Sequence, residues 1–157
     1  MAMQYDVKSQ HAASSGLMVP TRTRLKGAVI FPFSGATGYS AFVENTSLSG
    51  TYTRSTTTAT ITSVNHGLTT GQWVYLDWDL TDNPYQVTVT GNNTFTVTVA
   101  DSGAGSGSVI IWNKVLLQAD ASNATAFTIV VPGEGILAVE GIRVFLAANI
   151  HCTVFYG

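Results

Sequence analysis

The apolar and polar residues of this chain alternate with a period of two in several short segments. In residues 94–99, Phe95, Val97 and Val99 alternate with threonines, which gives an extended segment one apolar and one polar face. Residues 86–90 alternate in the same way, and the Gly91-Asn92-Asn93 sequence between the two segments favours a tight turn. We therefore predict a β-hairpin over residues 85–99.

Similar short segments, separated by Gly, Asn, Ser and Asp, continue along the rest of the chain. Their spacing is typical of a β-sandwich or barrel, and no window places apolar residues at helical spacing. The residues of 129–131 and 109–112 are apolar on both faces, which predicts strands that are central or covered by a neighbouring subunit. The pattern predicts an all-β protein with strands at residues 25–31, 39–44, 57–63, 72–78, 85–90, 94–99, 108–112, 115–118, 127–131, 135–139, 142–146 and 152–156.

The amino-acid composition changes near residues 50 and 113. Thr dominates between these positions, and Ser/Gly-rich stretches at 47–50 and 102–108, which we interpret as flexible, flank the Thr-rich part. We predict an outer antiparallel β-sandwich, jelly-roll-like, built from residues 21–50 and 114–157. A small Thr-rich β-barrel of residues 51–113 is then inserted in one of its loops. Residues 1–20 have no clean period and are predicted to form an extended arm.

Charged residues make up only 10% of the 157 residues, against about 25% in a typical soluble protein. So little charge predicts that much of the surface is buried in a homo-oligomer or a symmetric array. The net charge of −2 gives no case for direct binding of nucleic acid. Four of the basic residues lie near the start of the chain, where they can pair with an acidic partner or form a solvated tail; they are Lys8, Arg22, Arg24 and Lys26.

The sequence predicts no membrane attachment and no secretion, because no apolar run has the length of a membrane span or a signal peptide. Cys152 is the single cysteine, so it cannot form an internal disulfide. Its place in an apolar segment predicts a buried, inert thiol.

Residue types that catalysis requires are sparse. The three histidines, His11, His66 and His151, are far apart in sequence, and no nucleophile or phosphate-binding motif occurs. We predict that the protein is not an enzyme and has no cofactor. The acidic cluster of Asp77, Asp79 and Asp82 is the best candidate for a metal site, but it lacks the glycine and the distal glutamate of a helix–loop–helix calcium loop. We therefore predict no metal.

The segment from Trp73 to Trp78 carries the most informative aromatic residues. If Val74 and Leu76 face a core, alternation places Trp73 and Tyr75 outside, where they suit a subunit contact or a sugar-binding surface. The alternative is a strand that is buried on both faces.

Several short motifs resemble those of phage virion proteins. The Arg-Leu-Lys-Gly sequence at residues 24–27, Pro-Gly-Glu-Gly-Ile at 132–136 and Val-Phe-Tyr-Gly at 154–157 resemble small virion proteins of short-tailed marine and cyanobacterial bacteriophages. This likeness covers about half of the chain. Within residues 51–113, His66-Gly67-Leu68, Thr70-Gly71 and the sequence at 93–97 resemble a small barrel module of phage tail and other virion proteins.

The resemblance implies a structural protein of the virion, assembled in the host cytoplasm. Our leading hypothesis is a capsid decoration or cement protein that binds the major capsid protein, or another virion protein, through its arm and outer domain. A tail, collar or fibre-associated protein that contacts a host glycan is the first alternative. A carbohydrate-binding module is the second.

Overall fold

The protein is all-β, as predicted. The computed structural model describes residues 7–80, 84–101, 103–122 and 125–157. These residues contain antiparallel strands and one short 3-10 turn, η1 (Phe33–Gly35), but no α-helix. The chain divides into unit 1, residues 1–45 and 115–157, and unit 2, residues 46–114. Unit 2 therefore begins five residues before the predicted start of the inserted barrel at residue 51.

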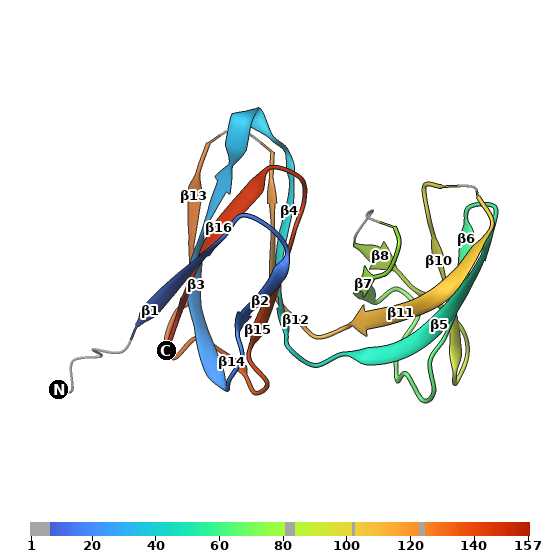
Figure 1. Cartoon of the computed structure of the whole chain (residues 1–157). Helices are drawn as coiled ribbons and strands as arrows, with labels where there is room; N and C mark the ends of the chain where they lie inside the picture. Colours follow the sequence, from blue (N-terminus) through green and yellow to red (C-terminus); the bar gives the residue numbers. More distant parts are fainter. Residues whose placement is uncertain (1–6, 81–83, 102, 123–124) are drawn as a thin grey trace. The chain divides into compact units, whose positions relative to one another are not determined.

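Unit 1 is a sandwich of two antiparallel sheets (Figure 1). The first sheet has the order β1-β16-β3-β13, with β14 also paired to β3. The second sheet has the order β12-β4-β15-β2. The bounds are β1 Lys8–Ala12, β2 Gly16–Val19, β3 Thr23–Pro32, β4 Gly38–Glu44, β12 Val115–Ala121, β13 Phe127–Val130, β14 Ile136–Ala138, β15 Ile142–Leu146 and β16 Ile150–Tyr156.

The core of unit 1 lies between its two sheets. Leu25 and Ile30 from β3 face Phe42 from β4 and Ile142 from β15, and all four side chains are fully buried. Full burial of one such side chain stabilises a fold by about 1.5–3 kcal/mol. Cys152 belongs to the same core, so the prediction of a buried thiol is confirmed.

Residues 8–19 are not a free arm. β1 pairs with β16 over five residues, and β2 pairs with β15 in the other sheet. The prediction of an arm was wrong for this segment because β1 is an exposed edge strand, which needs no apolar period, and its partner lies at the far end of the sequence. Met18 and Val19 of β2 are buried in the core. The rest of the predicted arm, residues 1–6, lies outside the described residues.

Unit 2 is one nearly closed, barrel-like sheet of seven strands in the order β8-β7-β11-β5-β6-β10-β9 (Figure 1). The bounds are β5 Leu48–Ser55, β6 Thr58–Thr62, β7 Trp73–Asp77, β8 Tyr85–Gln86, β9 Thr88–Gly91, β10 Thr94–Thr98 and β11 Gly105–Trp112. The predicted hairpin is confirmed by the β9–β10 pair, and Phe95, Val97 and Val99 are buried. Its turn uses a bulge at Thr94/Phe95, and Asn92 and Asn93 keep negative φ angles.

Residues 48–50 and 105–108 of the Ser/Gly-rich stretches lie in the paired strands β5 and β11 rather than in flexible linkers. Gly105 lies opposite Arg54, and Gly107 lies opposite Tyr52. A Cβ atom at Gly105 would lie 3.1 Å from the Arg54 guanidinium, and one at Gly107 would lie 3.2 Å from the Tyr52 ring. The glycines therefore alternate with serines because the inward positions of β11 must leave room for two large side chains of β5.

The outer surface of unit 2 is covered by threonines in register across neighbouring strands. Thr53, Thr60, Thr96 and Thr88 form one row across β5, β6, β10 and β9. The residues between them on β6 and β10, Ile61, Phe95 and Val97, face the core. The neutral threonine hydroxyl groups can bind water, so this surface is polar although it carries few charges. Unit 2 therefore does not need a neighbouring subunit to cover this surface.

Candidate partner-binding surface

The five-stranded sheet of unit 1 has one face against the core and one face directed away from it. Ala28, Ile30, Cys152 and Val154 are fully buried in the core. Because side chains alternate along a strand, the residues between them lie on the opposite face. We call this opposite face the outer face. Its rows across β1, β16, β3 and β13 are His11, Thr153, Val29 and Thr128; Ser9, Phe155, Gly27 and Val130; and His151 with Phe31.

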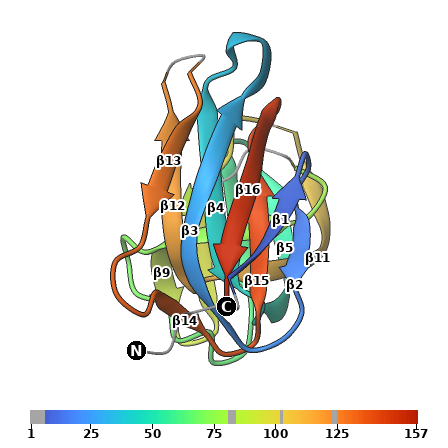
Figure 2. The same ribbon diagram turned by 90° about the vertical axis from the view of Figure 1, so that its left-hand side faces the viewer.

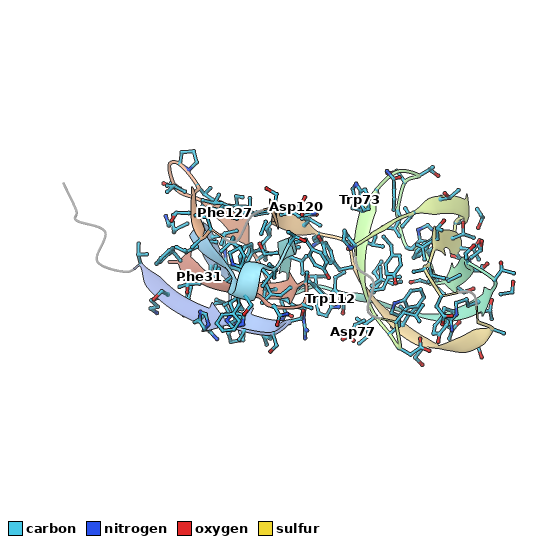
Figure 3. All side chains as sticks on the ribbon, turned by 90° about the horizontal axis from the view of Figure 1, so that it is seen from above. Phe31, Trp73, Asp77, Trp112, Asp120 and Phe127 are labelled. Carbon is cyan, nitrogen blue, oxygen red and sulfur yellow. The ribbon has the colours of Figure 1, made fainter. Side chains whose placement is uncertain are left out.

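The outer face contains no Asp, Glu, Lys or Arg in these rows, and four of its ten residues are large apolar side chains: Val29, Phe155, Val130 and Phe31. Figure 2 shows the four strands side by side as they appear from this side of unit 1. Phe31 is 38% exposed and Val130 is 75% exposed. Phe31 and Phe127 come from neighbouring strands and are labelled in Figure 3, but Phe127 shares a row with Ile30 and packs against the core. Phe31 and Val130 lie two rows apart on this face, and exposed large apolar side chains on one face mark a candidate contact surface.

Aromatic rings gather at one end of the outer face. The His151 ring stacks on Phe33, which is 59% exposed, with ring centroids 5.6 Å apart. The His11 ring meets His151 and Phe31 edge-on, at centroid distances of 5.8 and 6.2 Å. No pattern in the sequence predicts this cluster, because its members come from β1, β3, η1 and β16.

The predicted basic residues gather at the other end of the same sheet. β1 and β3 run in the same direction, because each is antiparallel to β16, so Lys8 and Arg24 both stand near strand starts. Arg24 forms an ion pair with Glu134 at 3.4 Å, and Lys26 donates to the Glu134 carbonyl oxygen at 2.8 Å. Arg22 and Lys8 are exposed. Two of the four cations therefore hold the turn before β14, and two extend into solvent.

The two predicted aromatic contacts of unit 2 have different positions. Trp73 is 49% exposed, as alternation predicted, and is labelled in Figure 3. Tyr75 is fully buried next to Trp112, its register partner on β11. Of the two interpretations of this strand, exposure is wrong for Tyr75 and burial on both faces is correct there, because alternation fixes the side of a strand on which a residue lies but not whether that side is covered.

Of the three aspartates proposed as a candidate metal site, Asp79 has a structural role. The Tyr52 hydroxyl donates to Asp79 Oδ1 at 2.6 Å, and this bond is the main reason why the pKa of Tyr52 is raised. Asp77 is exposed on β7, and Asp82 lies outside the described residues. Among the residues that the structure describes, no three His, Cys, Asp or Glu side chains form a cluster that could hold a metal ion.

One further ion pair lies in unit 2. Arg54, whose side chain is 6% exposed, donates to Asp101 Oδ2. The backbone N–H of Gly103 also donates to Asp101 at 2.9 Å. The bond from Gly103 and then the Arg54 contact lower the pKa of Asp101. The pair ties β5 to the segment before β11.

A hollow of about 260 Å³ in unit 2 lies beside His66 and is lined by Asn65, Gly67, Leu68, Val89, Gly91 and Asn92. His66 is buried, and both of its ring nitrogens are used within the protein. The ring therefore presents no free nitrogen to a ligand, and the hollow is a depression beside a structural histidine.

The fold and these surfaces define a two-unit, all-β protein whose distinguishing feature is the outer face of unit 1. A comparison with protein-family models gives no match, and a comparison with curated proteins gives none either. No helix among the described residues is long and apolar enough to cross a membrane.

Proposed function

We propose that this protein is a structural component of a bacteriophage virion, a capsid decoration or cement protein that attaches to the capsid shell through unit 1. The observation that carries the proposal is the outer face, where Phe31 and Val130 are exposed in rows without Asp, Glu, Lys or Arg, and where Phe33 of η1 is exposed against His151. The motif resemblance described above names the class of particle. The exposed cations Lys8 and Arg22 border the same sheet and suit an acidic partner surface.

The predicted strand at 127–131 supports this proposal. β13 lies at an edge of its sheet, so the explanation that it is a central strand does not hold. Its two-sided apolar character then fits the other explanation, cover by a neighbouring protein. Burial of a few such anchors at the centre of an interface commonly supplies most of the binding free energy.

A pair of matched valines tests the proposal. Val130 on the outer face is 75% exposed, and Val64 in unit 2 is 74% exposed. We expect Val130→Ser combined with Phe31→Ser to weaken binding of the recombinant chain to purified capsids at least tenfold, a loss of about 1.4 kcal/mol. We expect Val64→Ser to bind as the wild type. Val64→Ser should keep the wild-type thermal midpoint, because a largely exposed side chain contributes little to stability. The outer-face variant should lower the midpoint modestly, since Phe31 is only 38% exposed, and its binding is therefore compared at a temperature where circular dichroism shows that it is folded.

Copy number in purified particles provides the second measurement. A decoration protein is present in hundreds of copies, whereas a tail protein is present in a dozen or fewer. Wild-type binding by the outer-face variant, or a tail-like copy number, would overturn the capsid assignment.

Trp73 supports a second candidate, a tail or fibre-associated protein that contacts a host glycan. Its half-exposed indole is suited to stacking on a sugar ring. Because Tyr75 is buried, Trp73 is the one exposed aromatic residue of β7, where the sequence had suggested a pair. A glycan array with the wild type and Trp73→Ala tests this candidate, and a negative result with the wild type removes it.

A further inference from the structure

His11 and His151 lie next to each other on the outer face. In the β1–β16 pair, His11 is opposite Thr153, and His151 comes two residues before Thr153 on the same face. The two imidazoles are therefore diagonal neighbours on adjacent strands, with ring centroids 5.8 Å apart. His11 is exposed and His151 is partly exposed, so solutes in water can reach the space between them.

The surroundings restrict both rings. Phe33 stacks on His151 with an interplanar angle of 3°, and the edge of the His11 ring meets Phe31. His11 Nδ1 lies 3.2 Å from Thr153 Oγ1. A histidine that binds a metal commonly uses one ring nitrogen for the metal and the other for such a partner. In His11 this arrangement leaves Nε2 available.

The ring separation suits one shared ion. With a metal–nitrogen distance of about 2.0–2.1 Å, and about 1.1 Å from a nitrogen to its ring centre, each centre lies about 3.2 Å from the metal. Two such rings have centres about 5.2 Å apart at a tetrahedral angle and at most about 6.4 Å apart in a line. The observed 5.8 Å falls inside this range, so a small movement of two exposed side chains is sufficient.

We propose that His11 and His151 bind one divalent transition-metal ion, of which Zn²⁺ is the type, with water in the remaining positions. Imidazole nitrogen is a preferred ligand of Zn²⁺, Cu²⁺ and Ni²⁺. Among the described residues, no carboxylate or thiol adds a third protein ligand to the two histidines. We therefore expect weak, reversible binding, unlike a structural zinc site with four protein ligands. The ion would join the edge strand β1 to β16. The two histidines lie on the outer face, beside the Phe31 and Phe33 of the proposed capsid contact, but zinc binding by the free chain does not depend on that contact.

Isothermal titration of the metal-free, full-length chain with zinc chloride tests the site, after removal of any polyhistidine tag. We expect one Zn²⁺ per chain. His11→Ala and His151→Ala should each weaken binding at least tenfold, because each removes half of the chelate. Thr153→Val should weaken it by up to about tenfold, since it removes only the partner of His11 Nδ1.

Two controls separate this site from other zinc-binding groups. Ser9→Ala, two residues from His11 on the same strand and face, should bind Zn²⁺ as the wild type. In NMR spectra, a small amount of paramagnetic Ni²⁺ should broaden the ring signals of His11 and His151 and leave those of the buried His66 sharp. Slower amide exchange in β1 on addition of Zn²⁺ would show the connection to β16.

Two results would overturn the proposal. One is zinc binding that both alanine variants retain at wild-type strength. The other is a wild-type dissociation constant for Zn²⁺ weaker than about 1 mM. Such a constant corresponds to a binding free energy of only about 4 kcal/mol, which nonspecific contacts can supply.

Discussion

His66 connects two loops of unit 2 through its hydrogen bond to Gly91. Its Nδ1 accepts a hydrogen bond from the Leu68 N–H at 3.0 Å, and its Nε2 lies 3.1 Å from the Gly91 carbonyl oxygen. Because Nδ1 is the acceptor, the proton of the neutral ring must be on Nε2, which donates to Gly91. The ring also packs edge-on against Phe95 at a centroid distance of 5.2 Å. His66 thus joins the loop after β6 to the β9–β10 hairpin.

We expect His66→Ala to lower the free energy of unfolding of unit 2 by about 1–3 kcal/mol, because it leaves a buried N–H and a carbonyl group without partners. Tryptophan fluorescence during urea unfolding measures this change, since Trp73, Trp78 and Trp112 all lie in unit 2. Val64→Ala, at an exposed position two residues away, is the control and should change the value by less than about 0.5 kcal/mol. Equal stability of the two variants would contradict this role.

Tyr52→Phe should destabilise unit 2 by about 1 kcal/mol at neutral pH, because it removes the hydrogen bond to Asp79. The same fluorescence assay measures it. An unchanged urea midpoint would mean that the hydroxyl contributes nothing beyond what water supplies.

The Tyr52–Asp79 bond also predicts a dependence on alkaline pH. This bond, followed by burial, raises the pKa of Tyr52 above its ordinary value of 10.0. A raised pKa in the folded state contributes stability that is fully present below pH 10 and is lost as the pH rises through the folded value. The stability difference between the wild type and Tyr52→Phe should therefore shrink above pH 10. A constant difference up to the pH of global unfolding would exclude this linkage.

The Cys152 thiol should be unreactive in the native protein. Burial raises its pKa to about 12, and the thiolate is the reactive form. We expect an aromatic disulfide reagent to modify Cys152 slowly at pH 8 and rapidly in concentrated urea. The rate then reports the opening of unit 1. Rapid modification without denaturant would show that β16 opens readily.

Gly141→Ala should destabilise unit 1 strongly. Gly141 has a φ angle of +92°, and an added Cβ would lie 2.0 Å from the Val19 carbonyl oxygen. The backbone strain and the clash together should cost about 3 kcal/mol or more. Gly16→Ala in β2 is the matched control, because no atom lies within 4 Å of its added Cβ. Circular dichroism during thermal unfolding should separate the two variants by several degrees.

The sequence by itself determined the all-β class and much of the inward-facing set, although it did not predict β1, β2 or β5. In β10 the alternation of Phe95 and Val97 with threonines already identified the buried face, because side chains on a strand must alternate. The change in composition also indicated a Thr-rich module near residues 51–113. These features depend on neighbours close in the chain, and a single sequence contains that information.

Only the tertiary structure decided which strand faces are covered and which distant residues meet. Alternation placed Trp73 and Tyr75 on the same side, yet Trp73 is half exposed and Tyr75 is buried. β1 has no apolar period, and its pairing with β16 depends on a partner more than a hundred residues away. For the same reason His11 and His151 are unrelated in sequence and neighbours in space, because register between distant strands is set by the packing of the whole sandwich.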